Sequence, residues 1–266
     1  MAKRSQCGMP GFMRNVFTVF LVWLAMASVS GVAAPFTVEA GKPLIQDIEE
    51  TVAFNLSIEN PQGNVLLSQS KDSKIHLRAT TQYKEPLTVE IAGFGSEQVN
   101  ISVAYPEVEE TEIIILGPGE TLPTRSVKLE ISVPKELLQN LTVGTKNGDI
   151  GLHGAFDGEY AKERVLTATT VNGDITAKEF TALAGGTLKT KNGSVKITQL
   201  SGALSLTTTN GNIEVDEGAG NINASTRNGD IRVENRTADS VEAGAQSGSV
   251  FLNNPNAKKE TTVSSN

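Results

Sequence analysis

Cysteine, methionine and tryptophan are almost absent from this 266-residue sequence, and their few positions are informative. The only cysteine is Cys7, the only tryptophan is Trp23, and the four methionines fall between Met1 and Met26. Residues 34–266 therefore contain none of the three. Disulfide bonds and thiolate chemistry are excluded for this part of the chain.

Histidine and basic charge are also scarce. The two histidines, His76 and His153, lie far apart in the sequence, whereas a zinc site draws on several His or Cys ligands. We expect two surface histidines, no metal and no cofactor. The chain has 23 basic and 30 acidic residues, and only three basic ones precede Ala34, so the remainder carries a net charge of −10. Nucleic acids and anionic membranes bind basic surfaces, so neither is an expected partner.

The first 33 residues have the organisation of a secretory signal peptide. A basic start (Lys3, Arg4, Arg14) precedes an uncharged apolar run, and small residues follow up to Ala34. We predict cleavage after Ala33, which places the protein outside the cytoplasm (periplasm, cell surface or secreted) with no membrane insertion. The uncharged stretch has 19 residues, and a spanning helix needs about 20, so an uncleaved N-terminal membrane anchor is the alternative.

A segment with an Asn-Gly pair recurs through the second half of the chain. Six glycines follow one another at spacings of 25, 20, 18, 18 and 19 residues, and periods near 20 are typical of solenoids. The corner residues are Asn147 and Gly148, Asn172 and Gly173, Asn192 and Gly193, Asn210 and Gly211, Asn228 and Gly229, and Gly248 of a last copy in which serine replaces asparagine.

Apolar residues keep a fixed register with these glycines, two and four positions after each and five and seven before it. Residues two apart share one face of a strand, so each repeat is predicted to be strand, corner, strand and return segment. Asn and Gly both tolerate positive φ, and stacked asparagines are expected to form a hydrogen-bonded ladder. Phe180 and Leu200 suggest a third, short side. The local pattern fits a β-hairpin equally well.

The part before the repeats is strand-rich but irregular. Apolar residues surround Gly63 at the offsets of the later repeats, which predicts one early coil. We expect residues 34–138 to begin and cap the solenoid, residues 139–253 to form its repeats, and residues 254–266 to be a polar tail. A cap is expected because an open solenoid end exposes a strand edge.

The segment from Val127 to Ile150, followed by the repeated Thr-x-Asn-Gly-Asp-Ile copies, resembles the DUF4097 family of bacterial proteins, which carries the label of adhesin and is related to the GIN-type head domains of autotransporter adhesins. The resemblance covers most of the chain after the leader. It implies an all-β, single-stranded right-handed β-helix or β-solenoid rather than hairpins, with coils of about 18–25 residues. It implies no catalytic residues.

Three carboxylates directly follow corner glycines and are the candidates for ligand chemistry. Asp149, Asp174 and Asp230 would stack along one edge, where rungs are about 4.8 Å apart. Such an edge is compatible with Ca²⁺ binding or with paired carboxylates for glycoside hydrolysis. Serine and asparagine interrupt the column, and an Asp after Gly also stabilises a turn. We therefore assign no metal ligand and no catalytic residue.

These features favour a non-catalytic, exported binding or structural module of the adhesin type. Its expected partner is an envelope glycan or an exported protein. The alternatives are a polysaccharide-active β-helix enzyme that uses the edge carboxylates, and an envelope-stress or signalling protein that binds a partner. A column of threonines is a further candidate, as an outward hydrogen-bonding face for glycans, although threonine is also a good strand former. Its members are Thr145, Thr170, Thr190, Thr208 and Thr226.

Overall fold

The computed structural model describes residues 34–106, 125–157, 160, 162–180, 183–234, 237–253 and 259–264. The leader predicted over residues 1–33 lies outside this part of the chain. Every regular element among the described residues is a β-strand. These residues include no helix of the length and apolar character needed to cross a membrane.

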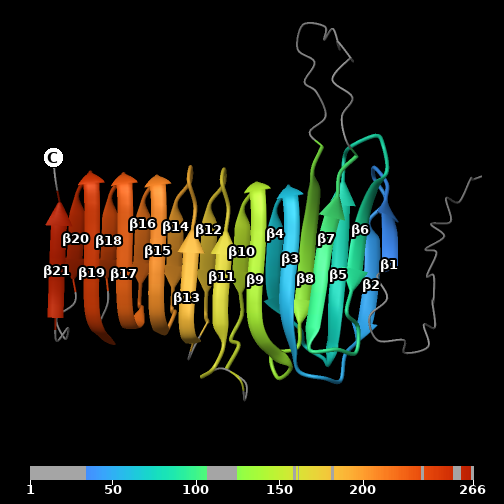
Figure 1. The fold of residues 1–266 in the computed structure, drawn as a ribbon, viewed down its shortest axis with the longest axis horizontal. Helices are drawn as coiled ribbons and strands as arrows, with labels where there is room; N and C mark the ends of the chain where they lie inside the picture. The colour runs from blue at the N-terminus through green and yellow to red at the C-terminus, as the bar shows by residue number, and fades with distance from the viewer. Residues whose placement is uncertain are drawn as a thin grey trace, which may run out of the picture.

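The strands form two long sheets that face each other (Figure 1). The first sheet has eleven strands in the spatial order β1 (Ala34–Val38), β6 (Leu87–Ala92), β7 (Gln98–Ala104), β3 (Phe54–Gln62), β9 (Leu138–Asn147), β11 (Val165–Thr169), β13 (Leu183–Lys189), β15 (Gly202–Asn210), β17 (Ala219–Asn228), β19 (Thr237–Ser247) and β21 (Lys259–Ser264). The second has ten, in the order β2 (Leu44–Glu49), β5 (Lys74–Thr81), β8 (Val127–Val133), β4 (Val65–Gln69), β10 (Ile150–His153), β12 (Ile175–Lys178), β14 (Val195–Thr198), β16 (Ile213–Asp216), β18 (Ile231–Glu234) and β20 (Val250–Asn253).

The solenoid prediction is confirmed and the hairpin alternative is wrong. In a hairpin β15 and β16 would pair with each other, but β15 pairs in parallel with β13 and β17, and β16 with β14 and β18. Each coil places one strand in each sheet and advances by one rung. In Figure 1 the parallel strands of the near sheet, such as β15 and β17, run upward, and the chain crosses at the corner to descend behind. The coil is therefore right-handed.

The predicted register is also the one observed. Ile150, Ile175, Val195, Ile213 and Ile231 pair in succession along the ten-stranded sheet, and each is at most 1 % exposed. Residues two apart point inward from both sheets, so they form one apolar core that runs the length of the molecule. On a third, short side, the Ser201 N–H donates to Phe180 O (3.1 Å) and the Ala219 N–H to Leu200 O (2.8 Å), and both apolar side chains are buried.

Four of the corner glycines have the expected positive φ, but close stacking of backbone requires glycine at all six corners. A Cβ on any of the six would lie 2.0–2.1 Å from the carbonyl oxygen of the glycine in the preceding coil. Gly148 and Gly193 share this contact although neither has a positive φ, and no corner asparagine has one. At the opposite corner the left-handed conformation is taken by Glu179, Gln199 and Glu217 (φ 65°, 56° and 54°).

The N-terminal part begins the solenoid and then adds antiparallel strands to the end of both sheets. The coil predicted around Gly63 is β3 and β4, and Ile58 pairs with Val143 and Val65 with Ile150. Beyond this coil, β1 and β7 both pair with β6 in antiparallel fashion, and β2 and β8 with β5. At the other end the predicted polar tail contains a strand: β21 pairs in parallel with β19.

A buried arginine fixes the longest coil, in which 25 residues separate Gly148 from Gly173. Arg164 has no exposed surface, and its guanidinium donates to Leu138 O (3.0 and 2.6 Å), to Lys135 O (3.2 Å) and to Phe156 O. Its Cζ lies 5.6 Å from the centroid of the Phe156 ring, which stacks on Phe180 at 4.8 Å. Burial lowers the pKa of Arg164 to about 10, which leaves the side chain charged at neutral pH.

Candidate functional site

The corner asparagines stack into a continuous ladder of amide hydrogen bonds. Each side-chain amide donates to the side-chain oxygen of the asparagine in the preceding coil, at 2.6–2.8 Å, from Asn228 back to Asn147. The internal amides of the ladder thus donate one hydrogen bond and accept another. The ladder therefore holds the coils in register, and its Asn side chains have a structural role.

The edge carboxylates belong to a second structural column. The oxygen of Asp149 accepts the N–H of Asp174 (2.9 Å), Asp174 accepts that of Ser194 (2.7 Å), and Asp230 that of Ser249 (2.8 Å). In the same way, the side-chain oxygen of Asn212 accepts the N–H of Asp230 (2.9 Å). Aspartate, asparagine and serine alternate here because each supplies an acceptor. No group of three or more His, Cys, Asp or Glu in the described ranges is arranged to hold a metal ion.

This role leads to a prediction for Asp174. Replacing it with asparagine keeps the acceptor, so the free energy of unfolding should change by less than about 0.5 kcal/mol. Replacing it with alanine removes the partner of the Ser194 N–H and should cost about 1 kcal/mol. Urea unfolding measures the change in the free energy of unfolding for each variant, and it is repeated with and without calcium to test for a bound metal. A calcium-dependent midpoint that Asp174→Asn abolishes would show a metal site instead.

The threonine column predicted to face outward faces inward. Thr145, Thr170, Thr190, Thr208 and Thr226 are at most 8 % exposed. Each hydroxyl donates to the carbonyl of a corner glycine in the preceding coil, at 2.8–3.3 Å, from Thr145 to Gly63 O up to Thr226 to Gly211 O. These hydroxyls help to bind successive coils together, and they are not available to a ligand.

The outward face of the eleven-stranded sheet carries a different row of hydroxyl and amide side chains. Seven consecutive strands contribute one residue each, and successive members are directly paired across the sheet. We call this set the hydroxyl row: Asn100, Ser57, Thr142, Thr167, Thr187, Ser205 and Asn223. All seven are uncharged; Ser57 and Thr167 are partly buried, and the other five are exposed. At about 4.8 Å per rung the row is about 30 Å long.

The ten-stranded sheet has a contrasting, charged outer face. Lys196 and Glu214 pair at 2.9 Å, Lys74 and Glu49 at 2.8 Å, and Arg78 and Glu130 at 3.7 Å. No ion pair found among the described residues involves the seven strands that carry the hydroxyl row. The outer face of the ten-stranded sheet thus differs from the hydroxyl row, whose seven members are uncharged.

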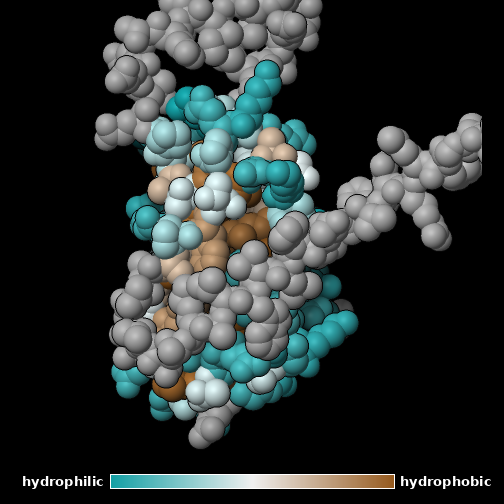
Figure 2. All heavy atoms as spheres, turned by 90° about the vertical axis from the view of Figure 1, so that its right-hand side faces the viewer, coloured by the Kyte–Doolittle hydropathy of each residue, from teal (hydrophilic) through white to brown (hydrophobic). Residues whose placement is uncertain are grey.

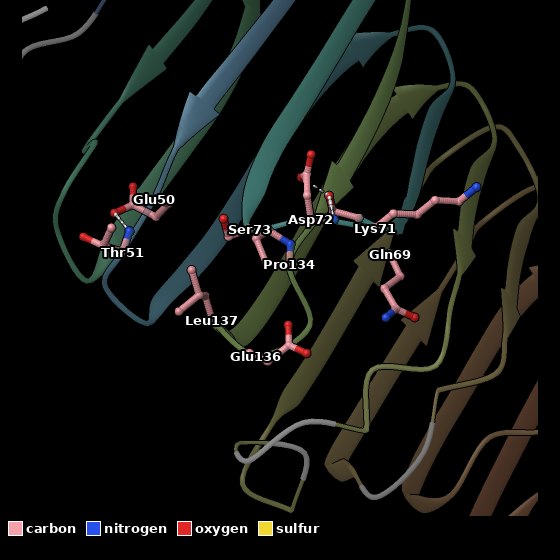
Figure 3. A pocket seen from close by; sticks show the side chains of 10 residues that line it. Glu50, Thr51, Gln69, Lys71, Asp72, Ser73, Pro134, Glu136 and Leu137 are labelled. Carbon is pink, nitrogen blue, oxygen red and sulfur yellow. Dashed lines mark hydrogen bonds between the residues drawn. The ribbon is translucent and has the colours of Figure 1, made fainter.

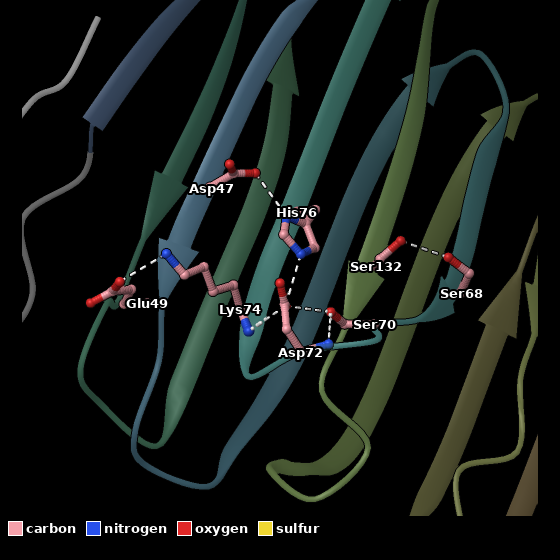
Figure 4. A network of polar contacts seen from close by, with 8 residues as sticks. All are labelled: Asp47, Glu49, Ser68, Ser70, Asp72, Lys74, His76 and Ser132. Carbon is pink, nitrogen blue, oxygen red and sulfur yellow. Dashed lines mark hydrogen bonds and ion pairs between the residues drawn. The ribbon is translucent and has the colours of Figure 1, made fainter. Parts of the chain in front are cut away.

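His76 is part of a network on this charged face (Figure 4). Its Nδ1 lies 2.7 Å from Asp47 and its Nε2 2.9 Å from Asp72. The hydrogen bond to Asp47 raises the pKa of His76, against the effect of burial. The Lys74 N–H, then Ser70 and His76, lower the pKa of Asp72 to about 2. The two carboxylates bind opposite ring nitrogens, so the three groups do not converge on one metal position and instead tie β2 and β5 to the Asp72 turn.

A shallow hollow lies beside this network, where the turns after β2, β4 and β8 meet (Figure 3). Glu50, Asp72 and Glu136 line it. Glu50 is 3 % exposed, and its two oxygens accept the N–H groups of Thr51 (3.3 Å) and Gly95 (3.1 Å). Its carboxylate is thus held by backbone. Neither this hollow nor a second one around Thr226 and Arg227 includes Asp149 or Asp174.

Several solved structures are similar to this chain but share little of its sequence. A proposed cell adhesion protein from Clostridium sporogenes shares 12 % identity at a TM-score of 0.43 and covers 83 % of this chain and 99 % of its own. A proposed adhesin from Bacteroides fragilis (14 %, TM-score 0.32) and a proposed lipid-binding protein from Parabacteroides distasonis (12 %, 0.37) each cover 85 % of this chain and 98 % of their own. No curated protein matches. The profile described as Toastrack DUF4097 matches residues 54–266, so the chain belongs to the DUF4097 family.

Proposed function

We propose that this protein is an exported, non-catalytic binding module of the adhesin type, which holds an uncharged envelope glycan against the hydroxyl row. The observation that carries the proposal is the row itself: seven uncharged polar side chains in register across seven strands. The family label of adhesin agrees with a binding role. The leader-like N-terminus supports export.

The chemistry of the row matches that of a polysaccharide. Hydroxyl and amide groups donate and accept hydrogen bonds, as sugar hydroxyls do. An uncharged partner avoids the cost of desolvating a charge. The side chains stand on paired strands, so their backbone is already ordered before binding and little conformational entropy is lost. A periodic row also suits a polymer, because each added sugar unit can meet another rung.

Retention on polysaccharides tests the proposal. Residues 34–266 contain every described strand and are the form to use. The purified chain is incubated with insoluble and soluble envelope polysaccharides, with calcium or with a chelator, and bound protein and released sugar ends are measured together. We expect retention without release, independent of calcium. Release of sugar ends would identify an enzyme instead, and the absence of retention on every glycan would direct the search to exported proteins.

A pair of matched variants locates the binding face. Thr167→Glu with Ser205→Glu places two carboxylates in the hydroxyl row and should weaken retention about tenfold or more, because about 1.4 kcal/mol of lost hydrogen bonding has that effect. Thr176→Glu with Thr198→Glu places the same charges on the outer face of the ten-stranded sheet. This control should bind like the original chain. Equal losses in both variants would contradict the assignment of the face.

A further inference from the structure

Within the part of the chain that the structure describes, no strand pairs with the outer edge of either end of the two-sheet stack. Strands β1 and β2 form one edge and β20 and β21 the other. The core continues to these edges: Leu44 and Ile48 on β2, and Val250 and Leu252 on β20, pack against it but are only partly buried. Figure 2 looks onto the N-terminal end, where apolar residues fill a strip between polar margins. At each end, the described strands therefore include no further rung over this apolar surface.

The two ends of the ten-stranded sheet also carry exposed apolar side chains in the same outer row. Ile45 is 60 % exposed on β2, and Phe251 is 51 % exposed on β20. Ile45 and Phe251 belong to one row of directly paired residues. The row starts at Ile45, passes through Arg78 and Glu130, and continues strand by strand across the sheet to Phe251. One row thus begins and ends with an exposed hydrophobic residue that is paired on one side only among the described strands, and Arg232 Cζ lies 5.5 Å from the centroid of the Phe251 ring.

The strand directions match at the two ends. Two antiparallel pairings separate β2 from β8, and every pairing from β8 to β20 is parallel, so β2 and β20 run the same way. In the other sheet two antiparallel pairings separate β1 from β7, and every pairing from β7 to β21 is parallel, so β1 and β21 also run the same way. A second copy placed head to tail can therefore continue both sheets with the parallel pairing that the solenoid already uses.

We infer that this protein associates with further copies of itself head to tail, with β20 of one copy paired to β2 of the next. This contact would extend both sheets, cover the partly buried Val250, Leu252, Leu44 and Ile48, and bring Phe251 beside Ile45. A protected edge strand usually carries charges or proline. β20 has neither. The charges of β2 are already engaged within the molecule, Asp47 by His76 and Glu49 by Lys74, and Pro35 on β1 removes one donor from the other seam.

A second copy fits these ends better than an unrelated extended peptide. A single peptide strand can satisfy one sheet edge, but here two edges end together, and each has a parallel counterpart at the opposite end of the molecule. A head-to-tail contact is heterologous, so it produces chains of copies rather than a closed dimer. Such a chain would align the hydroxyl rows of successive copies, which adds avidity for a polymer. The association itself does not depend on the proposed function.

Complementary edge variants test the inference. Ile45→Lys places a charge on β2 and blocks that end of the molecule, the head, whereas Phe251→Lys does the same on β20, the tail. Both side chains are already exposed, so folding should be unaffected. Sedimentation velocity of residues 34–266 over a range of concentrations should show assemblies for the unmodified chain and monomers for each variant alone. An equal mixture should form heterodimers and stop there, because each heterodimer has one blocked head and one blocked tail. Val165→Lys, a 45 % exposed valine in the middle of the other sheet, should assemble like the unmodified chain.

Other outcomes overturn the inference. A monomeric unmodified chain at all concentrations would exclude the contact. Dimers of Ile45→Lys that Phe251→Lys cannot form would show a tail-to-tail contact between two β20 strands instead. Assembly of both variants alone would place the interface elsewhere on the molecule, and a loss of assembly in Val165→Lys would show that the effect is not specific to the ends.

Discussion

Replacing Gly211 with alanine is expected to lower the free energy of unfolding by about 3 kcal/mol, at the upper end of the range for overpacked sites. The new Cβ would lie 2.0 Å from Gly193 O and 2.5 Å from Gly193 C. Both are backbone atoms of the preceding coil, so relief requires the two coils to separate. That separation would also strain the Asn192–Asn210 rung and the bond from Thr208 to Gly193 O. Urea unfolding followed by circular dichroism measures the change.

Gly185→Ala is the matched control. A Cβ at this position meets only Ala203 O, at 3.9 Å, which is an ordinary contact. A glycine within a strand is less favourable than alanine by about 0.5–1 kcal/mol, so this variant should be as stable as the original chain or slightly more so. Similar losses at Gly185 and Gly211 would mean that the corner stacking is not what requires glycine.

Arg164→Met should destabilise the protein by about 4 kcal/mol, because it leaves buried acceptors without donors. The guanidinium now serves the carbonyls of Lys135, Leu138 and Phe156, and methionine replaces its volume but none of these bonds. Arg164→Lys should recover part of the loss, because an ammonium group is a compact donor that cannot reproduce the planar fork. Urea unfolding followed by circular dichroism measures the stability of both variants.

Arg78→Met provides the comparison for Arg164. The Arg78 side chain is 56 % exposed and forms an ion pair of 3.7 Å with Glu130. Exposed ion pairs contribute at most about 1 kcal/mol, so this variant should change stability little. If Arg164→Met cost no more than Arg78→Met, the long coil would not depend on the buried guanidinium.

The solenoid was predictable because its pattern is periodic. Each coil must place apolar residues on the inner side of two strands, so Ile213 and Val215 follow Gly211 as Ile231 and Val233 follow Gly229. The stacked glycines must clear one another, which preserves one glycine per coil. The same two constraints identified the early coil around Gly63, although its neighbours in sequence are irregular.

The orientation of the threonines was predictable from the same alternation, but the outward orientation that we predicted for them is wrong. Thr208 lies two residues after Leu206 and four after Leu204, so it has the parity of the inward positions. Burial of its hydroxyl is tolerated because Gly193 O is within 2.8 Å. The hydroxyl row has the opposite parity: Ser205 lies between two inward leucines and points to solvent.

Arg164 and the His76 network were not predictable, for a different reason. The acceptors of Arg164 are backbone carbonyls of turns and strand ends, which have no residue-type pattern. Asp47, Asp72 and His76 meet because β2 and β5 pair in antiparallel fashion in the cap, outside the repeat register. Periodicity carries no information about either arrangement.

The position of the ligand on the protein is the most direct test of the proposed binding face. Because residues 34–266 contain no cysteine, single cysteines can be introduced as reporters, Ser205→Cys in the hydroxyl row and Glu214→Cys on the opposite outer face. The rate of thiol labelling is measured with and without the retained glycan. We expect the glycan to slow labelling at position 205 and leave position 214 unchanged. Protection at 214, or equal protection at both positions, would contradict the assignment of the hydroxyl row.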